Sequence, residues 1–551
     1  MTATPPDNAT LRRRHRLQAV GADGALALTV ALVAVFCAWP IVAMLARSLD
    51  GGPAAAAARF AKVLGDSSPL IANSLFCGML AAALSCAVAL AVAVVGAFGP
   101  RRLGTAARGA ALLSMVSPPF LASLAYIQLF GRRGLVTHGL LGLSCDPYGW
   151  LGIVVMQGLF FCAVNVMLLQ ASISRIDRRL MAAAADLGAS GTRVFLDVVM
   201  PLVRPTLAAC FLLTFVRSVS DYGTPVVIGG AFETVASRIY VQLTGYGDLA
   251  GAAVLNICLL ACAVAAYGAR RHLDAKAERL VAGTMGEGDA GTWRLTGPAA
   301  AVLSCVACAF AAFVAVLYLA IVRCAFVRGM GWGAPFTLEN FRHLVDFDLA
   351  PLGRGMAYGA LAALVGCALG AAVAYFCHRR HVAGSPLLSF AAAMPYMLPG
   401  TCLGLGYILS FNSGPLKLTG TGAVIVAVLA ARQLTVSVDA FSNALGQVPR
   451  DLDRAAADLG AGELTCFSSV LWPNLREAVA VSLLNGFSSA MMAYGAVVFL
   501  VAPSTKTGIV QLFDALSGGR YGYAAAIAVV LIAITLAVDL VSWRLAGRGR
   551  R

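Results

Sequence analysis

The chain has 551 residues, of which 60% are hydrophobic and only 12% are charged. Soluble domains carry about 25% charged residues, so this composition excludes a soluble protein and indicates an integral membrane protein. The formal net charge is +15, but Arg-rich segments beside membrane spans account for it, and we expect no nucleic-acid partner. Membrane lipid is the first partner that the composition predicts.

Apolar stretches long enough to cross a bilayer as helices, about 20 residues each, recur about twelve times. The first follows basic residues between Arg12 and Arg16 and has no small-residue cleavage site behind it, so we expect a retained helix. The predicted spans are residues 24–48, 70–98, 109–130, 149–172, 205–227, 250–268, 298–323, 353–377, 387–411, 421–443, 478–501 and 522–543.

Basic residues set the predicted orientation because they are retained on the cytoplasmic side of a membrane. With the N-terminus inside, about 26 of the 41 basic residues fall in cytoplasmic segments. Both termini, residues 1–23 and 544–551, are then cytoplasmic tails. A polar stretch at 269–297 is predicted to be a cytoplasmic linker between a first half at 24–268 and a second half at 298–543.

A Gly-anchored segment occurs twice, 272 positions apart. The first copy reads AAADLGASGTRVFLDVVMP from Ala183 to Pro201, and the second reads AAADLGAGELTCFSSVLWP from Ala455 to Pro473. Matching residues continue on both sides of the segment in the same register. The chain therefore consists of two homologous halves, which we expect to be related by a pseudo-twofold axis along the membrane normal, with the translocation path between them.

The repeated segment is predicted to be a helix-turn-helix at the cytoplasmic membrane surface, within loops 176–204 and 448–476. Three Ala favour a helix that Gly188 or Gly460 interrupts, and a second short helix should follow. The small Ala face and the apolar Leu and Phe side chains suit docking to a partner. The alternative, a plain connecting loop, is weakened because Gly, Phe and Pro recur in both copies.

The predicted docking residues occupy matching positions in the two copies. They are Ala183, Ala184, Asp186, Leu187, Gly188, Ala189, Phe195 and Pro201 in the first, and Ala455, Ala456, Asp458, Leu459, Gly460, Ala461, Phe467 and Pro473 in the second.

At these residues the chain resembles the inner-membrane permease subunits of binding-protein-dependent ABC importers. The family signature is Glu-Ala-Ala, three residues, Gly and, after a fixed gap, Pro, and both copies match it at Gly188 and Gly460 and in the gap to Pro. The leading Glu is replaced by Ala182 in one half and by Arg454 in the other. This departure puts in doubt any salt bridge that the family makes through the Glu.

The resemblance implies a type I ABC importer permease: an all-α protein of the bacterial inner membrane with about twelve transmembrane helices in two six-helix halves. It implies that the repeated segments are coupling helices for a cytoplasmic ATP-binding cassette ATPase, present in two copies, and that a periplasmic binding protein delivers the substrate. The chain lacks a Gly-x-x-x-x-Gly-Lys-Ser/Thr phosphate loop. We therefore expect a non-catalytic subunit that binds no cofactor, with ATP and Mg on the ATPase.

The cargo is predicted from a weaker resemblance. Fused two-half permeases look typical of ferric-iron and thiamine importers, and the phrases SDYGTP at 220–225 and MPYMLPG at 394–400 resemble the ferric-iron branch. Ferric iron is the predicted cargo, and thiamine, phosphonate and polyamine are the alternatives for the same machinery. An ion-coupled secondary transporter is the alternative class, but it should show ionisable residues at midplane in both halves. A membrane scaffold would need no symmetry.

Polar and Pro residues inside predicted spans are candidates for the path, because ionisable groups at membrane depth are costly and Pro-broken helices often border transport paths. Asp221 breaks the symmetry: its carboxylate either faces the path and favours a cation, or caps a broken helix. Arg432 either faces the path or pairs within the bundle, where Asp439 is two turns away. His and Cys residues are too scattered to predict a metal site. The pathway candidates are Pro118, Pro119, Asp221, Tyr222, Pro395, Pro399, Arg432 and Tyr494.

Overall fold

The computed structural model describes residues 8–117, 119–143, 146–282, 293–329, 332–347, 349–413, 415–459 and 461–548. Within these ranges the chain is mainly helical, and its one β feature is an isolated bridge between Val327 and Phe336. Nine helices are long and apolar enough to cross a membrane, and two bent pairs raise the number of spans to eleven. The predicted all-α membrane fold is confirmed.

The first half supplies fourteen α-helices. They are α1 (Asn8–Val33), α2 (Trp39–Ser48), α3 (Pro53–Asp66), α4 (Ser68–Phe98), α5 (Arg101–Val116), α6 (Pro119–Phe130), α7 (Trp150–Phe160), α8 (Cys162–Ser174), α9 (Arg178–Asp186), α10 (Gly191–Val194), α11 (Met200–Ser220), α12 (Gly223–Ile228), α13 (Val235–Val241) and α14 (Leu249–Ala282).

The second half supplies twelve. They are α15 (Pro298–Ala325), α16 (Glu339–Phe347), α17 (Leu349–Ala374), α18 (Ser385–Met397), α19 (Gly400–Phe411), α20 (Gly422–Gln447), α21 (Asp451–Asp458), α22 (Glu463–Cys466), α23 (Trp472–Asn474), α24 (Arg476–Met491), α25 (Gly508–Ser517) and α26 (Tyr521–Arg548).

The third span of each half is broken. Residues 387–411 form α18 and α19, which meet at 113°. Leu398 is extended (ψ 146°) because the ring of Pro399 disfavours a helical residue before it. Residues 109–130 form the corresponding bent pair, α5 and α6. The prediction of broken spans is confirmed, although Pro118 itself lies outside the described residues.

The fifth span of each half, predicted at 205–227 and 478–501, ends early. Helices α11 and α24 stop at Ser220 and Met491, just before a Tyr-Gly pair that occupies the same register in both halves. Helix α24 has 16 residues, fewer than the roughly 20 needed to cross a bilayer. With each bent pair taken as one span, the described residues thus provide eleven candidate spans and one shorter helix in place of the twelfth.

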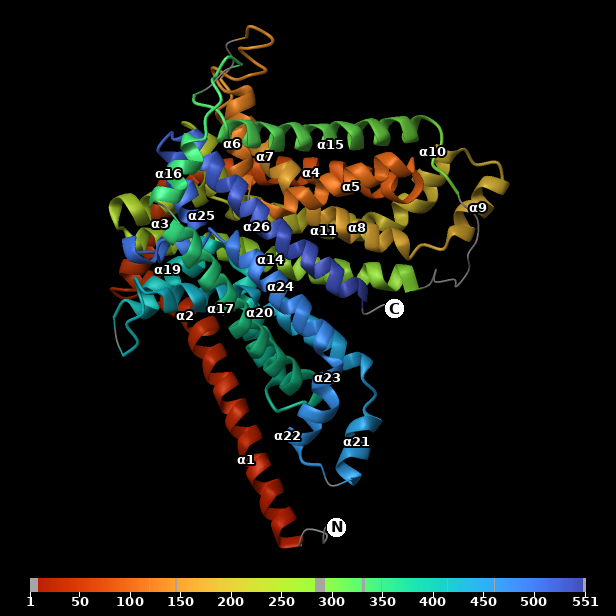
Figure 1. Ribbon diagram of the computed structural model, residues 1–551, viewed down its shortest axis with the longest axis vertical. Helices are drawn as coiled ribbons and strands as arrows, with labels where there is room; N and C mark the ends of the chain where they lie inside the picture. The colour runs from red at the N-terminus through yellow and green to blue at the C-terminus, as the bar shows by residue number, and fades with distance from the viewer. Residues whose placement is uncertain are drawn as a thin grey trace.

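Each half gives its first spanning helix to the other half. Helix α2 of the first half packs on α19 of the second, and α15 of the second half packs on α4, α5 and α6 of the first. Figure 1 shows α15 lying along the first half. Helix α15 also packs on α26 of its own half, so it joins the two repeats.

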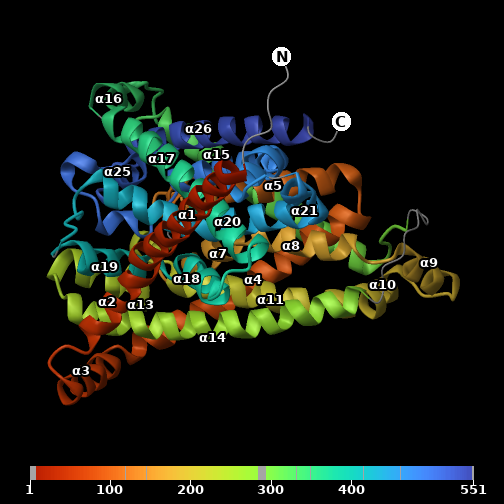
Figure 2. The ribbon, with the colours of Figure 1, turned by 90° about the horizontal axis from the view of Figure 1, so that it is seen from below.

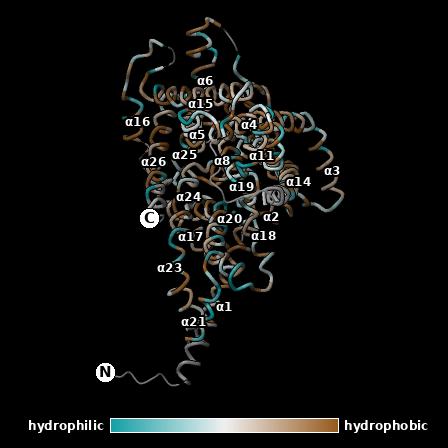
Figure 3. Tube along the Cα trace, turned by 90° about the vertical axis from the view of Figure 1, so that its right-hand side faces the viewer, coloured by the Kyte–Doolittle hydropathy of each residue, from teal (hydrophilic) through white to brown (hydrophobic). Residues whose placement is uncertain are grey.

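The two halves share a core at one end and separate toward the other. The largest buried cluster contains residues of both halves, whereas two smaller clusters belong to one arm each. In Figure 1 the arms diverge, one toward α9 and the other toward α21, and seen from below α9 and α10 project beyond the end of the bundle (Figure 2). Hydrophobic residues run along most of the bundle (Figure 3). Residues 269–282, expected in the linker, continue α14 as helix.

Candidate functional site

The first repeated segment forms two short helices at the tip of its arm. Helix α9 begins after Asp177, whose carboxylate accepts a hydrogen bond from the backbone N–H of Arg179 at 2.9 Å. It ends at Asp186, and Gly188, two residues further on, has φ +86°. The N–H of Ala189 then donates to the carbonyl of Ala184 at 3.0 Å, a closing bond typical of a glycine-terminated helix. The predicted helix-turn-helix is confirmed.

The second copy repeats this turn with α21 and α22. The N–H of Ala461 donates to the carbonyl of Ala456 at 2.9 Å, which is the same closing bond one repeat later. Gly460 lies outside the described residues. The matched residues Leu187 and Leu459 are 89% and 88% exposed, more than any other large hydrophobic side chain in the described part of the chain.

The phenylalanines of the repeated segment turn inward. Phe195 is 6% exposed and belongs to the core of the first arm, and the Phe467 ring packs edge-on against Tyr375 with centroids 5.3 Å apart. We expected both on the docking surface. Instead, each lies in the π-helical turn that follows the short second helix and faces its own arm, so each holds the segment in place.

The remaining predicted docking residues divide by exposure. Ala184, Ala189 and Ala461 are half-buried and Ala456 is buried, whereas the exposed residues are Ala183, Asp186, Pro201, Ala455, Asp458 and Pro473.

Two tyrosines from matching positions close the interface between the halves. The ring centroids of Tyr222 and Tyr494 are 5.3 Å apart, and the two residues are 2% and 4% exposed. The Tyr222 hydroxyl donates to the carbonyl oxygen of Gly495 at 3.3 Å. The register that aligns these residues in the sequence therefore also brings them together in space.

Four further aromatic residues surround this pair. Tyr240 stacks on Tyr222 at 5.2 Å, and Phe513 stacks on Tyr494 at 4.3 Å. Phe120 contacts both Tyr494 and Phe513, and Phe499 contacts both Tyr222 and Tyr240. We call this set the aromatic plug: Phe120, Tyr222, Tyr240, Tyr494, Phe499 and Phe513. Only the two matched tyrosines were predicted, because the other four come from segments that no sequence pattern links.

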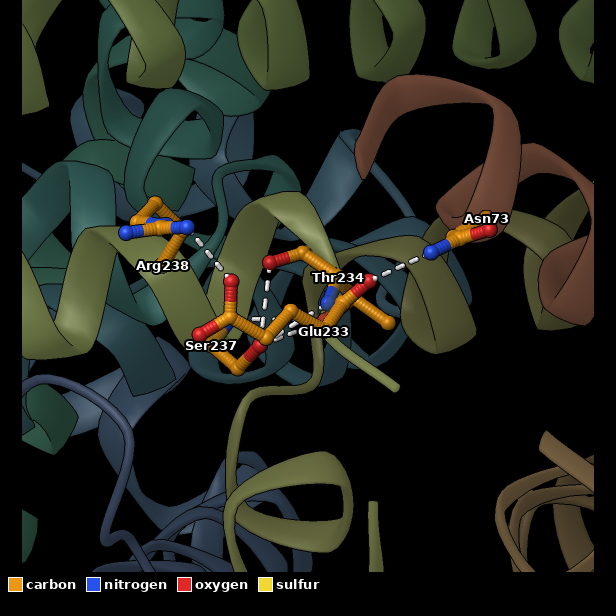
Figure 4. Close-up of polar contacts among 5 residues, drawn as sticks. All are labelled: Asn73, Glu233, Thr234, Ser237 and Arg238. Carbon is orange, nitrogen blue, oxygen red and sulfur yellow. Dashed lines mark hydrogen bonds and ion pairs between the residues drawn. The ribbon is translucent and has the colours of Figure 1, made fainter. Parts of the chain in front are cut away.

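The plug residue Tyr240 belongs to α13. Polar contacts around the N-terminal turn of this helix hold it in place (Figure 4). The Thr234 hydroxyl accepts from the N–H of Ser237 at 3.3 Å, and the Ser237 hydroxyl accepts from the N–H of Thr234 at 2.9 Å. Arg238 pairs with Glu233 at 2.6 Å. Asn73 of α4 donates to the Glu233 carbonyl at 3.0 Å. These bonds fix α13 to α4 and so position its tyrosine.

Asp221 lies beside the plug and acts as a cap. Its carboxylate accepts from the backbone N–H of Gly223 at 3.0 Å and of Thr224 at 3.4 Å, and from the side-chain amide of Gln157 at 3.0 Å. With these three donors the carboxylate is satisfied within the first half. The structure favours the capping role over a ligand role in the path.

The predicted Pro residues lie close to the plug. Pro119 begins α6, directly before a plug residue, and Pro395 is buried within α18. Pro399 precedes Gly400, where a Cβ would lie 2.7 Å from the carbonyl carbon of Gly495. The bend between α18 and α19 therefore contacts the Tyr494-Gly495 pair of the second half.

Arg432 of α20 reaches the same interface. One of its guanidinium nitrogens lies 3.7 Å from the position that a Cβ on Gly495 would occupy. No ion pair within the described ranges includes Arg432 or Asp439, so the pairing considered from the sequence is not found.

Two membrane halves that meet at a closed plug and carry matched exposed loops on diverging arms define a two-repeat permease. Two ranges, residues 86–279 and 351–550, match the binding-protein-dependent transport system inner membrane component family. The chain belongs to this family, as its resemblance predicted, and contains the domain twice.

Similarity to individual relatives extends over nearly the whole chain. The chain is 28% identical to the ferric transport system permease protein FbpB of Actinobacillus pleuropneumoniae, over 94% of this chain and 77% of the relative. It is 28% identical to the putative ferric transport system permease protein FbpB 1 of Haemophilus influenzae, over 87% and 77%. A putative 2-aminoethylphosphonate transport system permease protein, PhnV of Salmonella paratyphi A, is 30% identical over 39% of this chain and 81% of the relative.

Proposed function

We propose that this chain is the permease subunit of an ATP-driven importer of ferric iron. The cargo follows from the relatives named for ferric transport, which match both halves in a single chain. Separate cytoplasmic ATPases hydrolyse ATP with Mg, and the chain itself binds no cofactor. A periplasmic binding protein delivers the cargo, and both termini lie in the cytoplasm.

The observation that carries the docking role is the matched exposure of Leu187 and Leu459. Burying one exposed leucine in a partner contributes roughly 1.5–3 kcal/mol. Each leucine stands on a turn fixed by the same closing hydrogen bond. Two equivalent anchors on two separate arms suit two ATPase copies, one for each arm.

The separated arms and the closed plug suggest how the two ends are coupled. ATPase closure brings the docking loops together, and because each arm is a packed bundle with its own core, the arms move as units about the shared core. The aromatic plug lies in that shared core. Closing the arms therefore opens the plug toward the binding protein, so the present arrangement corresponds to the state open toward the ATPases.

The test is ATPase activity of the complex in lipid nanodiscs with a ferric-loaded or a thiamine-loaded binding protein. Leu187→Asp with Leu459→Asp should abolish co-purification of the ATPase and its stimulation. The matched control is Leu140→Asp, which replaces a leucine that is 71% exposed in a loop far from the repeats. Equal co-purification of the ATPase with the double variant and with the control contradicts the docking role, and stimulation by the thiamine-loaded protein alone contradicts the cargo.

Phosphonate is a second candidate cargo. The observation that favours it is the 30% identity to the permease named for 2-aminoethylphosphonate, which is confined to 39% of this chain. A phosphonate-loaded binding protein in the same nanodisc assay separates the two cargoes.

A further inference from the structure

Each half contributes one arginine close to the Tyr-Gly pairs of the plug. Arg432 belongs to α20 of the second half and Arg217 to α11 of the first. The groups that act electrostatically on the Arg432 guanidinium are Tyr396, Tyr222 and Arg217. Within the described ranges neither arginine takes part in an ion pair. We call Arg217 and Arg432 the arginine pair.

The arginine pair lies on the docking-loop side of the plug. Helix α11 begins at Met200, directly after the first docking loop, and runs toward the plug. Arg217 lies in the last turn of α11, five residues before Tyr222. Arg432 approaches the same level from the other half, next to Gly495. Cargo that has passed the plug therefore meets the arginine pair first.

Two like charges that act on each other at membrane depth are unfavourable, and ionisable groups at this depth usually mark a transport path. A partly buried arginine is normally compensated by a carboxylate. Asp221, one turn beyond Arg217, already accepts hydrogen bonds from Gly223, Thr224 and Gln157. Since no described carboxylate lies within 4.0 Å of either guanidinium group, an anionic ligand is well suited to compensate the arginine pair.

The same charges disfavour a bare metal ion. Fe³⁺ would be repelled by both guanidinium groups at close range. In the part of the chain that the structure describes, no three His, Cys, Asp or Glu residues lie together as a metal site. A ferric ion that passes this point has to keep ligands of its own.

We propose that the arginine pair binds anionic oxygens of the cargo, so that the cargo crosses as an oxyanion or as a ferric ion held by an oxyanion chelator. Guanidinium groups match carboxylate and phosphate-type oxygens because they donate two parallel hydrogen bonds. The neighbouring Tyr396 hydroxyl can add a donor, because its side chain is exposed. The transport step rests on the proposed function, but anion binding by the chain does not.

The first test measures binding to the purified full chain without ATPase, by equilibrium dialysis with three probes. These are iron-55 citrate with carbon-14 in the citrate, radiolabelled 2-aminoethylphosphonate, and the neutral ferric complex of acetohydroxamate. We expect an anionic probe to bind, and Arg217→Gln or Arg432→Gln to weaken it at least tenfold. Arg217→Lys and Arg432→Lys should retain part of the affinity. Arg204→Gln, on the exposed start of the same α11, should bind as the unaltered chain does.

The outcomes separate the sources of the anion. Iron and citrate retained together support a chelated ferric cargo, and retention of 2-aminoethylphosphonate alone supports a free organophosphonate. Failure of every anionic probe to bind, equal binding of the neutral complex, or unchanged anion binding in both Gln variants overturns the proposal.

A second test distinguishes this proposal from the proposed function, with uptake into proteoliposomes that contain the complete importer. If both Gln variants take up ferric cargo at the unaltered rate while the Leu187→Asp, Leu459→Asp variant does not, the arginine proposal fails and the importer function stands. If the Gln variants alone lose uptake but keep cargo-free ATPase activity, the arginine pair acts on the cargo.

Discussion

Tyr222 and Tyr494 are 272 positions apart in the chain, yet their rings meet at a centroid distance of 5.3 Å. Each follows a helix, α11 or α24, that stops before the end of its predicted span. Residues at matching positions of the two repeats therefore contact each other across the interface between the halves. In the proposed mechanism, in which the arms move as units about the shared core, both tyrosines belong to one seal that opens or closes as a whole.

Removing either tyrosine should open the seal. Tyr222→Ala or Tyr494→Ala leaves a void where a buried ring stood, and we expect faster passive rubidium flux through proteoliposomes. Truncation of a large buried aromatic side chain also costs about 3–5 kcal/mol of stability. Phe441→Ala is the control, because Phe441 is fully buried in the separate core of the second arm. It should lower the melting temperature without raising flux, and equal flux in the control would show that the plug is not the seal.

The contact between Gly400 and Gly495 gives a test that depends on one methyl group. A Cβ on Gly400 would lie 2.7 Å from the Gly495 carbonyl carbon, whereas a Cβ on Gly495 would find its nearest neighbour, the Gly400 Cα, at 3.5 Å. Gly400→Ala should therefore force the bend away from the plug and cost about 1–3 kcal/mol. Gly495→Ala should be tolerated. Thermal unfolding in detergent compares the two, and equal melting temperatures would contradict the close approach.

The sequence was sufficient for the features that depend on local pattern. The repeat predicted the turn at Gly188, and Pro399 predicted the break between α18 and α19. It could not predict the exchange of α2 and α15 between halves, because an apolar helix surface looks the same whether it faces lipid or another helix. It also missed Phe120 and the other plug residues from unmatched segments, since only tertiary packing brings them together.

The second docking loop is tethered through Arg379, which lies in the π-helical turn Tyr375–Arg379 directly after α17. The Arg379 side chain is 7% exposed and pairs with Asp453 at 2.6 Å. The guanidinium also donates to the carbonyls of Val448 at 2.8 Å and Pro449 at 3.1 Å. Arg379→Met should cost about 1–3 kcal/mol, toward the lower end because Asp453 is one-third exposed. Hydrogen exchange should accelerate in residues 448–476.

The control for this tether lies in the same loop. Arg454 pairs with Asp451 at 3.3 Å, but both side chains are largely exposed, at 79% and 86%. Arg454→Met should therefore change stability by only about 0–1 kcal/mol and leave hydrogen exchange unchanged. Loss of protection in both variants, or in neither, would contradict the special role of the buried arginine.

Gly188 is required because of its backbone conformation, and not because a larger side chain would clash with its neighbours. It has φ +86°, and a Cβ built on it would have no neighbour within 4 Å. A β-branched residue in this conformation is strained by roughly 1–2 kcal/mol, so Gly188→Val should disturb the turn that presents Leu187. We expect the ATPase to bind roughly 5- to 30-fold more weakly. Gly188→Asn should bind almost normally, because Asn tolerates positive φ.

The matched control for this position is Gly446→Val. Gly446 also has no neighbour within 4 Å for a Cβ, but it lies in the helical α20 without a positive φ. The added side chain is the same, so titration of purified ATPase against the nanodisc-embedded variants isolates the effect of φ. Equal weakening by Val and Asn at 188 would mean that the added side chain itself blocks docking. Unchanged affinity of Gly188→Val would mean that the ATPase does not bind this turn.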